Sequence, residues 1–291
     1  MKRTAALRYP TPKAPGSPIV RHAVPADPPT GPLVRVAISS DGRVLATAGA
    51  DGWLHVVELE VGRVAFSVDL GAPVVDLTLT ASSVFAAIGR EVRLVNGLAG
   101  RAQPPLLLDA PVRAIAVSHD GSAYAAVDVD GQVVVVRTLT GRRTFTAQVA
   151  GGRCVAFTPD DRALRVGRDD GEVSVFAIGA PTASTASTAS TASTASTAST
   201  ASPVPALRLR DRATLRGDRV LGPDGATLGD GVTTFDAIGD VVLVGGPTGW
   251  SVVGEGTVTS PPVVDLALHP GLTHAVIATS DGAVELVALP D

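Results

Sequence analysis

The sequence is short of cysteine, lysine and aromatic residues. Cys154 is the one cysteine among 291 residues, so no disulfide can form within the chain and the fold does not depend on an oxidising compartment. Lysine occurs only at Lys2 and Lys13, and such dominance of arginine is typical of GC-rich bacterial genomes. Aromatics make up 3% of the residues, whereas valine, alanine and glycine are abundant, a composition that favours strands and turns over helices.

Strong charge of one sign and long apolar runs are also missing. The formal net charge of −4 gives no overall positive field that would attract nucleic acid or anionic lipid. Residues 1–18 lack the apolar core of about seven or more residues that a secretory signal needs, and no apolar run approaches the length of a membrane span. We therefore expect a cytoplasmic protein without a nucleic-acid or membrane partner, with residues 1–16 forming a flexible basic tail.

The chain contains an internal repeat. The phrase PVVDLTLT at 73–80 returns as PVVDLALH at 262–269, and related copies begin at Pro32, Pro111 and Gly151. Each copy has an alternating apolar segment, a polar turn, a small-residue segment, a second turn and a Val-rich segment. Many of the turns are Asp-Gly, which between apolar runs is a strong signal for a β-hairpin. Each copy therefore predicts at least three antiparallel strands.

The stretch before the next copy predicts a fourth strand, at Val64–Val68, Pro105–Leu108 and Thr144–Val149. Four short strands in every ~40 residues indicate the blade of a β-propeller. One blade cannot bury both of its faces, but blades packed radially around an axis can. The sequence therefore predicts an all-β, single-domain β-propeller with four-stranded antiparallel blades, extending over residues 17–291.

The copies predict seven blades, with six as the alternative. In addition to the five clear copies, residues 232–259 have the pattern of a blade. Residues 206–231 carry short alternating segments around Asp224-Gly225, enough for a truncated blade. The last blade reaches the C-terminus after three strands. We expect Ser17–Val24 to supply its fourth strand by pairing with Val284–Ala288, because otherwise a sheet edge stays bare.

A low-complexity tract interrupts this domain. Thr182–Ser202 consists of seven copies of Thr-Ala-Ser, without charge or an apolar period. Such a tract cannot offset the entropy of ordering, so we expect a disordered loop at a tolerated position between blades. The alternative is a functional spacer or a modified Ser/Thr stalk.

The repeats resemble those of the WD40 family. VAISSDGRVLATAGADGWLHVVEL, at 36–59, is similar to that family's strand–turn–strand–turn–strand pattern, and the resemblance covers most of 32–178 and 262–289. The family's Trp-Asp signature is eroded to Val57-Glu58, Val136-Arg137, Phe176-Ala177 and Val287-Ala288. The resemblance implies a rigid scaffold that binds other proteins, with blades held together by aliphatic packing instead of the family's Asp–His network.

The sequence predicts no catalytic residue, no metal site and no cofactor. No Gly-x-Ser-x-Gly elbow or Walker-type loop is present, and Cys154 lies in an apolar strand where an inert buried thiol is expected. Asp128–Gly131 and Asp169–Gly171 resemble part of a calcium loop, but both fall where the repeat needs a tight turn. No zinc-type spacing connects the histidines His22, His55, His119, His269 and His274.

One set of charged residues is predicted to bind a partner. Alignment of the inner strands places Asp265, Arg35 and Asp76 at the same position in the last, first and second blades, which are neighbours in a closed ring. One position earlier, the third and fourth blades carry Arg113 and Arg153. We predict that these residues line the mouth of the central channel and bind another protein, the propeller itself being monomeric.

Two alternatives remain at this point. The charged row can instead be a set of ion pairs that fixes the register between blades. The propeller can also be an enzyme or small-ligand binder, because carboxylates from different blades can meet at the axis without any linear motif.

Overall fold

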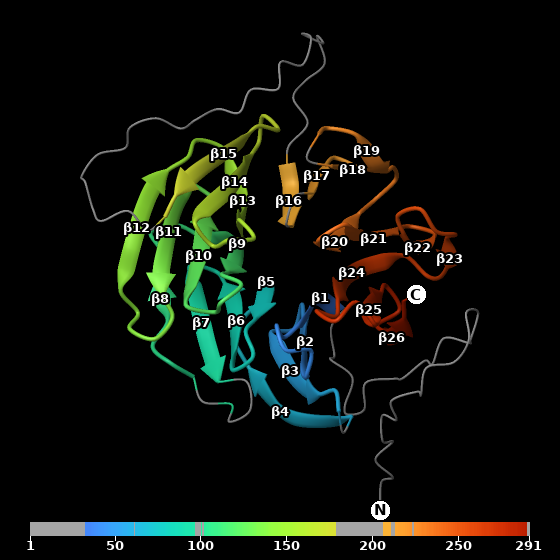
Figure 1. Cartoon of the computed structure of the whole chain (residues 1–291). Coiled ribbons are helices and arrows are strands. Elements are labelled where there is room, and N and C mark those ends of the chain that lie inside the picture. The colour runs from blue at the N-terminus through green and yellow to red at the C-terminus, as the bar shows by residue number, and fades with distance from the viewer. Residues whose placement is uncertain are drawn as a thin grey trace, which may run out of the picture.

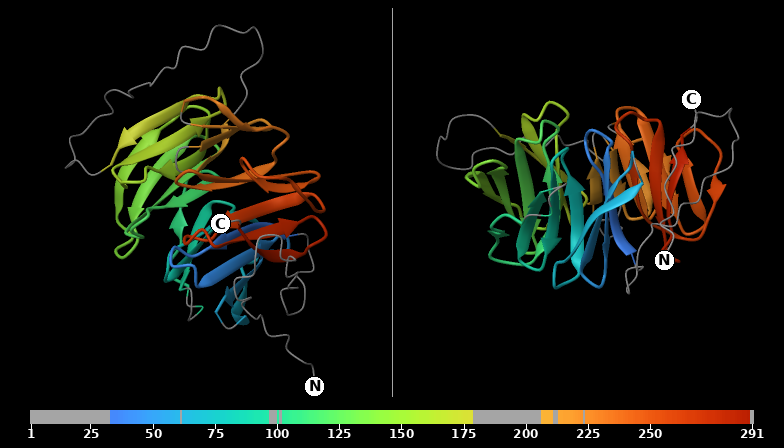
Figure 2. Two further views of the ribbon diagram at one scale, coloured as in Figure 1. Left: turned by 45° about the vertical axis from the view of Figure 1, so that its right-hand side comes forward. Right: turned by 90° about the horizontal axis from the view of Figure 1, so that it is seen from below.

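The computed structural model describes residues 33–60, 62–96, 100, 102–178, 206–210, 213–222 and 224–289. All regular elements in these ranges are strands, which form seven small antiparallel sheets around a common axis (Figure 1). The predicted all-β propeller with seven blades is therefore confirmed. Seen from the side, the sheets stand next to one another as a disc with turns on its two faces (Figure 2).

The first four blades follow the repeats. Blade 1 comprises β1 (Leu33–Ile38), β2 (Val44–Gly49), β3 (Trp53–Glu58) and β4 (Arg63–Asp69); blade 2 comprises β5 (Val74–Leu79), β6 (Ser83–Ile88), β7 (Glu91–Asn96) and β8 (Leu106–Leu107); blade 3 comprises β9 (Val112–Val117), β10 (Ala123–Asp128), β11 (Gln132–Arg137) and β12 (Arg143–Gln148); blade 4 comprises β13 (Gly152–Phe157), β14 (Ala163–Arg168) and β15 (Val173–Ala177).

The remaining three blades include blade 5, which the sequence predicts only as a truncated blade. Blade 5 comprises β16 (Ala206–Arg210), β17 (Ala213–Arg216), β18 (Arg219–Leu221) and β19 (Thr227–Gly229); blade 6 comprises β20 (Thr234–Ile238), β21 (Val241–Gly246), β22 (Gly249–Val252) and β23 (Val258–Thr259); blade 7 comprises β24 (Val263–Leu268), β25 (His274–Thr279) and β26 (Val284–Ala288). Blade 5 is not truncated in strand number, because it has four strands that are only short.

Blades 4 and 7 have three strands each within the described ranges, whereas the other five have four. The segment that we expect to complete blade 7, Ser17–Val24, lies outside the described residues, as do the tail 1–16 and the tract Thr182–Ser202. The closing strand and the domain limits therefore stay predictions. Among the described residues no helix is long and apolar enough to cross a membrane.

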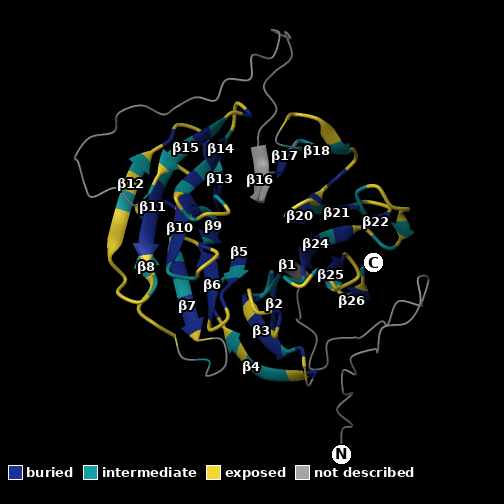
Figure 3. Cartoon of the chain, in the orientation of Figure 1, coloured by how far each residue is buried: buried dark blue, intermediate teal, exposed yellow. Residues whose placement is uncertain are grey.

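The blades pack through aliphatic side chains. β2, β6 and β10 are buried at every position, because each blade is covered by a neighbour on both sides (Figure 3). Between blades 3 and 4, for example, Val127 and Val135 pack against Phe157 and Leu164. Each fully buried Val or Leu side chain contributes about 1.5–3 kcal/mol, so these contacts account for the recurrence of the repeat.

The turns use local hydrogen bonds and glycine. In four of them a Ser or Thr hydroxyl donates to the Asp two residues later, over 2.6–2.7 Å: Ser39–Asp41, Ser118–Asp120, Thr158–Asp160 and Thr279–Asp281. Gly131 has a φ of 82°, and a Cβ there would collide with the Val149 carbonyl oxygen. The second Asp-Gly turn of blade 3 therefore requires glycine.

Candidate functional site at the mouth face

The first strand of each blade is the one nearest the axis, and we call it the inner strand (Figure 1). Most inner strands carry a β-bulge near their first residues. Ladder pairing skips one residue in six of the seven inner strands: Val34, Val75, Arg113, Arg153, Leu207 and Val264. A bulge frees its residue from the ladder and re-aims the side chain. All six lie where the inner strands begin, on the face of the disc that also carries the turns between second and third strands. We call this the mouth face.

Arg35 and Asp76 lie close together. Arg35 Nε is 3.6 Å from Asp76 Oδ1 across the seam between blades 1 and 2. The other oxygen, Asp76 Oδ2, accepts a hydrogen bond of 2.8 Å from the main-chain N–H of Ile115 in blade 3. Asp76 therefore connects three successive blades, while 32% of the Arg35 side chain remains exposed.

Asp265 closes the ring. Its Oδ2 accepts a hydrogen bond of 3.0 Å from the main-chain N–H of Val36, 229 residues earlier in the chain. Its Oδ1 accepts one of 3.1 Å from the hydroxyl of Thr234 in blade 6. Only 1% of Asp265 is exposed, so this carboxylate links blades 6, 7 and 1 inside the protein.

Asp236 makes the same kind of contact but was missed by the sequence analysis. Its Oδ2 accepts a hydrogen bond of 2.8 Å from the main-chain N–H of Leu268, from blade 6 to blade 7. A signal was available, since Asp236 is the one charged residue of the strand TFDAI. It was overlooked because Asp236 stands two positions further along its strand than Asp76 and Asp265 do.

Arg113 and Arg153 converge on one carboxylate. Arg153 Nη1 donates to Asp169 Oδ1 over 2.9 Å, and Arg113 Nη1 lies 3.7 Å from the same oxygen. Asp169 belongs to the turn between β14 and β15, the segment whose sequence resembles part of a calcium loop. Its side chain is 49% exposed. The next carboxylate, Asp170, is paired with Arg168 at 2.6 Å.

The opposite face has its own link between blades 3 and 4. Asp161, with a φ of 54°, accepts hydrogen bonds from the main-chain N–H groups of His119 and Asp120 at 2.9 and 3.0 Å. Its Oδ1 also lies 2.9 Å from His119 Nδ1. The Ser118 hydroxyl lowers the pKa of Asp120, and the Thr158 hydroxyl does the same to the pKa of Asp160. These bonds stabilise the ionised turns.

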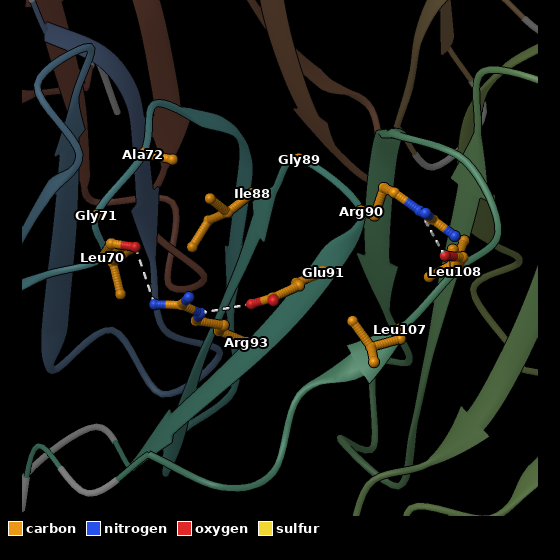
Figure 4. Close-up of a pocket in the computed structure, with 10 residues that line it drawn as sticks. All are labelled: Leu70, Gly71, Ala72, Ile88, Gly89, Arg90, Glu91, Arg93, Leu107 and Leu108. Carbon is orange, nitrogen blue, oxygen red and sulfur yellow. Dashed lines mark hydrogen bonds and ion pairs between the residues drawn. The ribbon is translucent and has the colours of Figure 1, made fainter.

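A hollow of about 520 Å³ lies beside blades 1 and 2 (Figure 4). Arg93 donates to the Leu70 carbonyl oxygen at 2.9 Å and to Glu91 at 2.8 Å, and Arg90 donates to the Leu108 carbonyl oxygen at 3.2 Å. Both guanidinium groups are thus engaged within the protein. The hollow offers the exposed Leu107 but no convergent reactive groups.

The cysteine and the histidines considered as candidates lie where they have structural roles. Cys154 is buried on β13, and His119 and His269 lie in matching turns after β9 and β24. His55 on β3 is buried, its Nδ1 lies 2.8 Å from the Ser67 hydroxyl, and desolvation lowers its pKa. Within the described part of the chain, no three His, Cys, Asp or Glu residues gather as they would around a metal ion.

Comparison with known proteins agrees with this architecture. No family model matches the chain. The chain is similar to the WD repeat-containing protein SL1-17 of Schistosoma mansoni, with 29% identity over 153 residues, which cover 50% of each protein. It thus spans about half the length of the curated relative it matches. The chain is a seven-bladed β-propeller, and this similarity is consistent with WD40-like repeats.

Proposed function

We propose that this propeller is a non-catalytic scaffold that binds another protein at the mouth face. WD repeat propellers generally mediate protein–protein interactions, and this supports the general class. The observation that carries the proposal is the placement of Arg113 and Arg153. Both stand on adjacent rigid strands, outside the ladder, with about a third of each side chain exposed. Rigid presentation lowers the entropy cost of binding.

The predicted partner-binding residues have different parts in this proposal. Arg35, Arg113 and Arg153 contact the partner, because their side chains reach the surface. Asp76 holds Arg35 in position. Asp265 supports the mouth from inside the seam, since its buried carboxylate is engaged by Val36 and Thr234.

The alternative, an enzyme or small-ligand binder at the axis, would need carboxylates available for chemistry. Asp76, Asp236 and Asp265 each accept a main-chain hydrogen bond from the next blade. Carboxylates engaged in this way hold the blades together, and this favours the scaffold.

The test is affinity capture from cells of the source organism with purified protein as bait. The bait variants are a mouth variant, Arg113→Gln with Arg153→Gln, and a charge-matched control on the opposite face, Arg142→Gln with Arg162→Gln. Arg162 is exposed in the turn between β13 and β14. Arg142 is exposed in the turn between β11 and β12. We expect one set of proteins to be captured by the wild type and the control and lost with the mouth variant. Equal capture by all three baits would refute binding at the mouth face.

A further inference from the structure

We infer that Arg113 and Arg153 form a binding site for an anionic group of the partner protein, a carboxylate or a phosphate, and that Asp169 occupies this site in the free protein. This inference rests on the proposed scaffold function and adds the chemistry of the recognised group. Arginine is suited to it because its planar guanidinium donates paired hydrogen bonds to carboxylate and phosphate oxygens.

The charges at this site do not balance, because the two arginines face only one carboxylate and one further anion would neutralise them. Two guanidinium groups from adjacent blades face one carboxylate, and the neighbouring Asp170 is taken by Arg168 at 2.6 Å. Asp169 satisfies the two arginines unequally, at 2.9 Å for Arg153 and 3.7 Å for Arg113. Arg113 Nη1 is shielded from solvent and has no hydrogen-bond partner within the described residues. A donor in this state gains a bond when an added anion binds.

Asp169 is placed so that it can leave. Its main-chain N–H donates to the Gly151 carbonyl oxygen at 2.7 Å, which fixes the turn independently of the side chain. The half-exposed side chain can therefore rotate into water while the backbone stays in place. Its pairing with Arg153 is a surface ion pair, which contributes less than about 1 kcal/mol to stability. A polyvalent or better-placed anion can displace it at small cost.

The surroundings of the arginine pair add an apolar element. Val75 occupies the bulge position in blade 2, next to Arg113 in the ring, and is 37% exposed. Val129 follows β10 at the mouth face and is 40% exposed, with its N–H bonded to the Pro111 carbonyl oxygen. The site therefore suits an acidic or phosphorylated residue that is followed or preceded by an apolar side chain.

The experiment titrates purified full-length protein with inorganic phosphate and, separately, with acetate, at constant ionic strength. The side-chain Nε–H resonances of Arg113 and Arg153 report binding. The variants are Asp169→Asn, Arg153→Gln and the charge-matched control Arg219→Gln, whose exposed side chain lies in blade 5. Thermal unfolding checks that each variant is folded.

We expect Asp169→Asn to bind anions about fivefold more tightly than the wild type, which corresponds to Asp169 blocking the pair for about four-fifths of the time. Arg153→Gln should abolish saturable binding, and Arg219→Gln should leave it unchanged. Tighter binding of phosphate than of acetate would assign the site to a phosphorylated partner, and comparable binding would assign it to a carboxylate.

The inference is overturned if Asp169→Asn binds no more tightly than the wild type, or if Arg219→Gln weakens binding as much as Arg153→Gln does. These results are independent of partner capture. Anion binding without any captured protein would refute the scaffold and leave the anion site standing. Capture that depends on the mouth, without anion binding, would do the reverse.

Discussion

The seam between blades 7 and 1 and the seam between blades 3 and 4 use carboxylates in opposite ways. At the first seam, Asp265 is 1% exposed and accepts hydrogen bonds from Val36 and from Thr234. At the second, Asp169 is 49% exposed and meets two arginine side chains at the mouth face. The first seam joins the two ends of the ring, whereas the second joins consecutive repeats.

The difference shows how burial assigns a role to the same kind of residue. A buried carboxylate bonded to main-chain donors is costly to remove, because those donors lose their partner in a place that water does not reach. An exposed carboxylate beside arginines contributes little to stability, because water screens the pair and replaces it readily. The closing seam therefore uses its aspartate for cohesion, and the seam between blades 3 and 4 keeps its aspartate exchangeable.

The largest effect is expected from removing the segment that we predict to complete blade 7. Deletion of residues 1–26 should leave β26 as a bare edge and expose the apolar residues packed behind it. At about 2–4 °C per kcal/mol for a protein of this size, the melting temperature should fall by more than about 5 °C. The matched control is deletion of residues 1–16 alone, which should change nothing. Identical melting of the two truncated proteins would show that Ser17–Val24 does not close the ring.

Asp265→Ala should have the next largest effect. The substitution removes the carboxylate that accepts hydrogen bonds from the Val36 N–H and the Thr234 hydroxyl, and each buried hydrogen bond lost in this way costs about 1–3 kcal/mol. We expect the free energy of unfolding, measured in urea, to drop by about 3 kcal/mol or more. Asp265→Asn keeps one acceptor oxygen and should lose less than half of this. A loss below about 1 kcal/mol for the alanine variant would remove the distinction between the two seams.

Asp161→Ala tests the second seam on the face opposite the mouth. The side chain accepts from two main-chain N–H groups of blade 3, so its loss should cost about 1–2 kcal/mol, in the range of a helix or turn cap. The donors are exposed, and water replaces part of the lost bonds. Asp161→Asn, which suits a positive φ and keeps one acceptor, should be nearly neutral. An alanine variant as costly as Asp265→Ala would contradict a weakly held second seam.

The smallest effect is a pH dependence that separates the seams. Burial lowers the pKa of His55, which faces blade 7, below its usual 6.5. The unfolded chain then binds more protons than the folded one, so stability is full above pH 6.5 and declines as the pH falls from 6.5 towards the folded value. Asp120 and Asp160, at the second seam, have a lowered pKa, so their contribution is present above pH 3.8 and is lost below it.

Thermal unfolding between pH 7.5 and pH 3 should therefore show two declines. His55→Gln should reduce the first and leave the second in place. Desolvation also lowers the pKa of His274, so His274→Gln, added to His55→Gln in a double variant, should remove the remainder of the first decline. An undiminished first decline in the variant that carries both His55→Gln and His274→Gln would exclude these histidines as its cause.

Much of the fold could be predicted from the sequence because each blade repeats the same order of apolar segments and turns. Asp-Gly turns and apolar alternation are properties of neighbouring residues, so they located β1 to β15 and β24 to β26 within a few residues. Blade 5 was underestimated because its strands are only three to five residues long, which leaves little periodicity to detect. The pairing of Arg35 with Asp76 followed from aligning equivalent positions of adjacent blades.

The rest of the site depends on how separate turns approach one another. Nothing in the local sequence indicates that Asp169 reaches Arg113 and Arg153, because the three residues come from two inner strands and a turn. The same holds for Asp161, whose partners lie in another blade. Such contacts depend on the distance between blades and on the bulge, and neither is encoded in a single repeat.

The bulge has a consequence for how such a ring can diversify. A bulge residue is not paired in the ladder of its sheet. Its identity can therefore change while the neighbouring strands keep their alignment. Valine, leucine and arginine already coexist at this one position of the repeat. Six of the seven blades thereby contribute one independently exchangeable position to a common rim, and new recognition can arise by point changes that leave the disc intact.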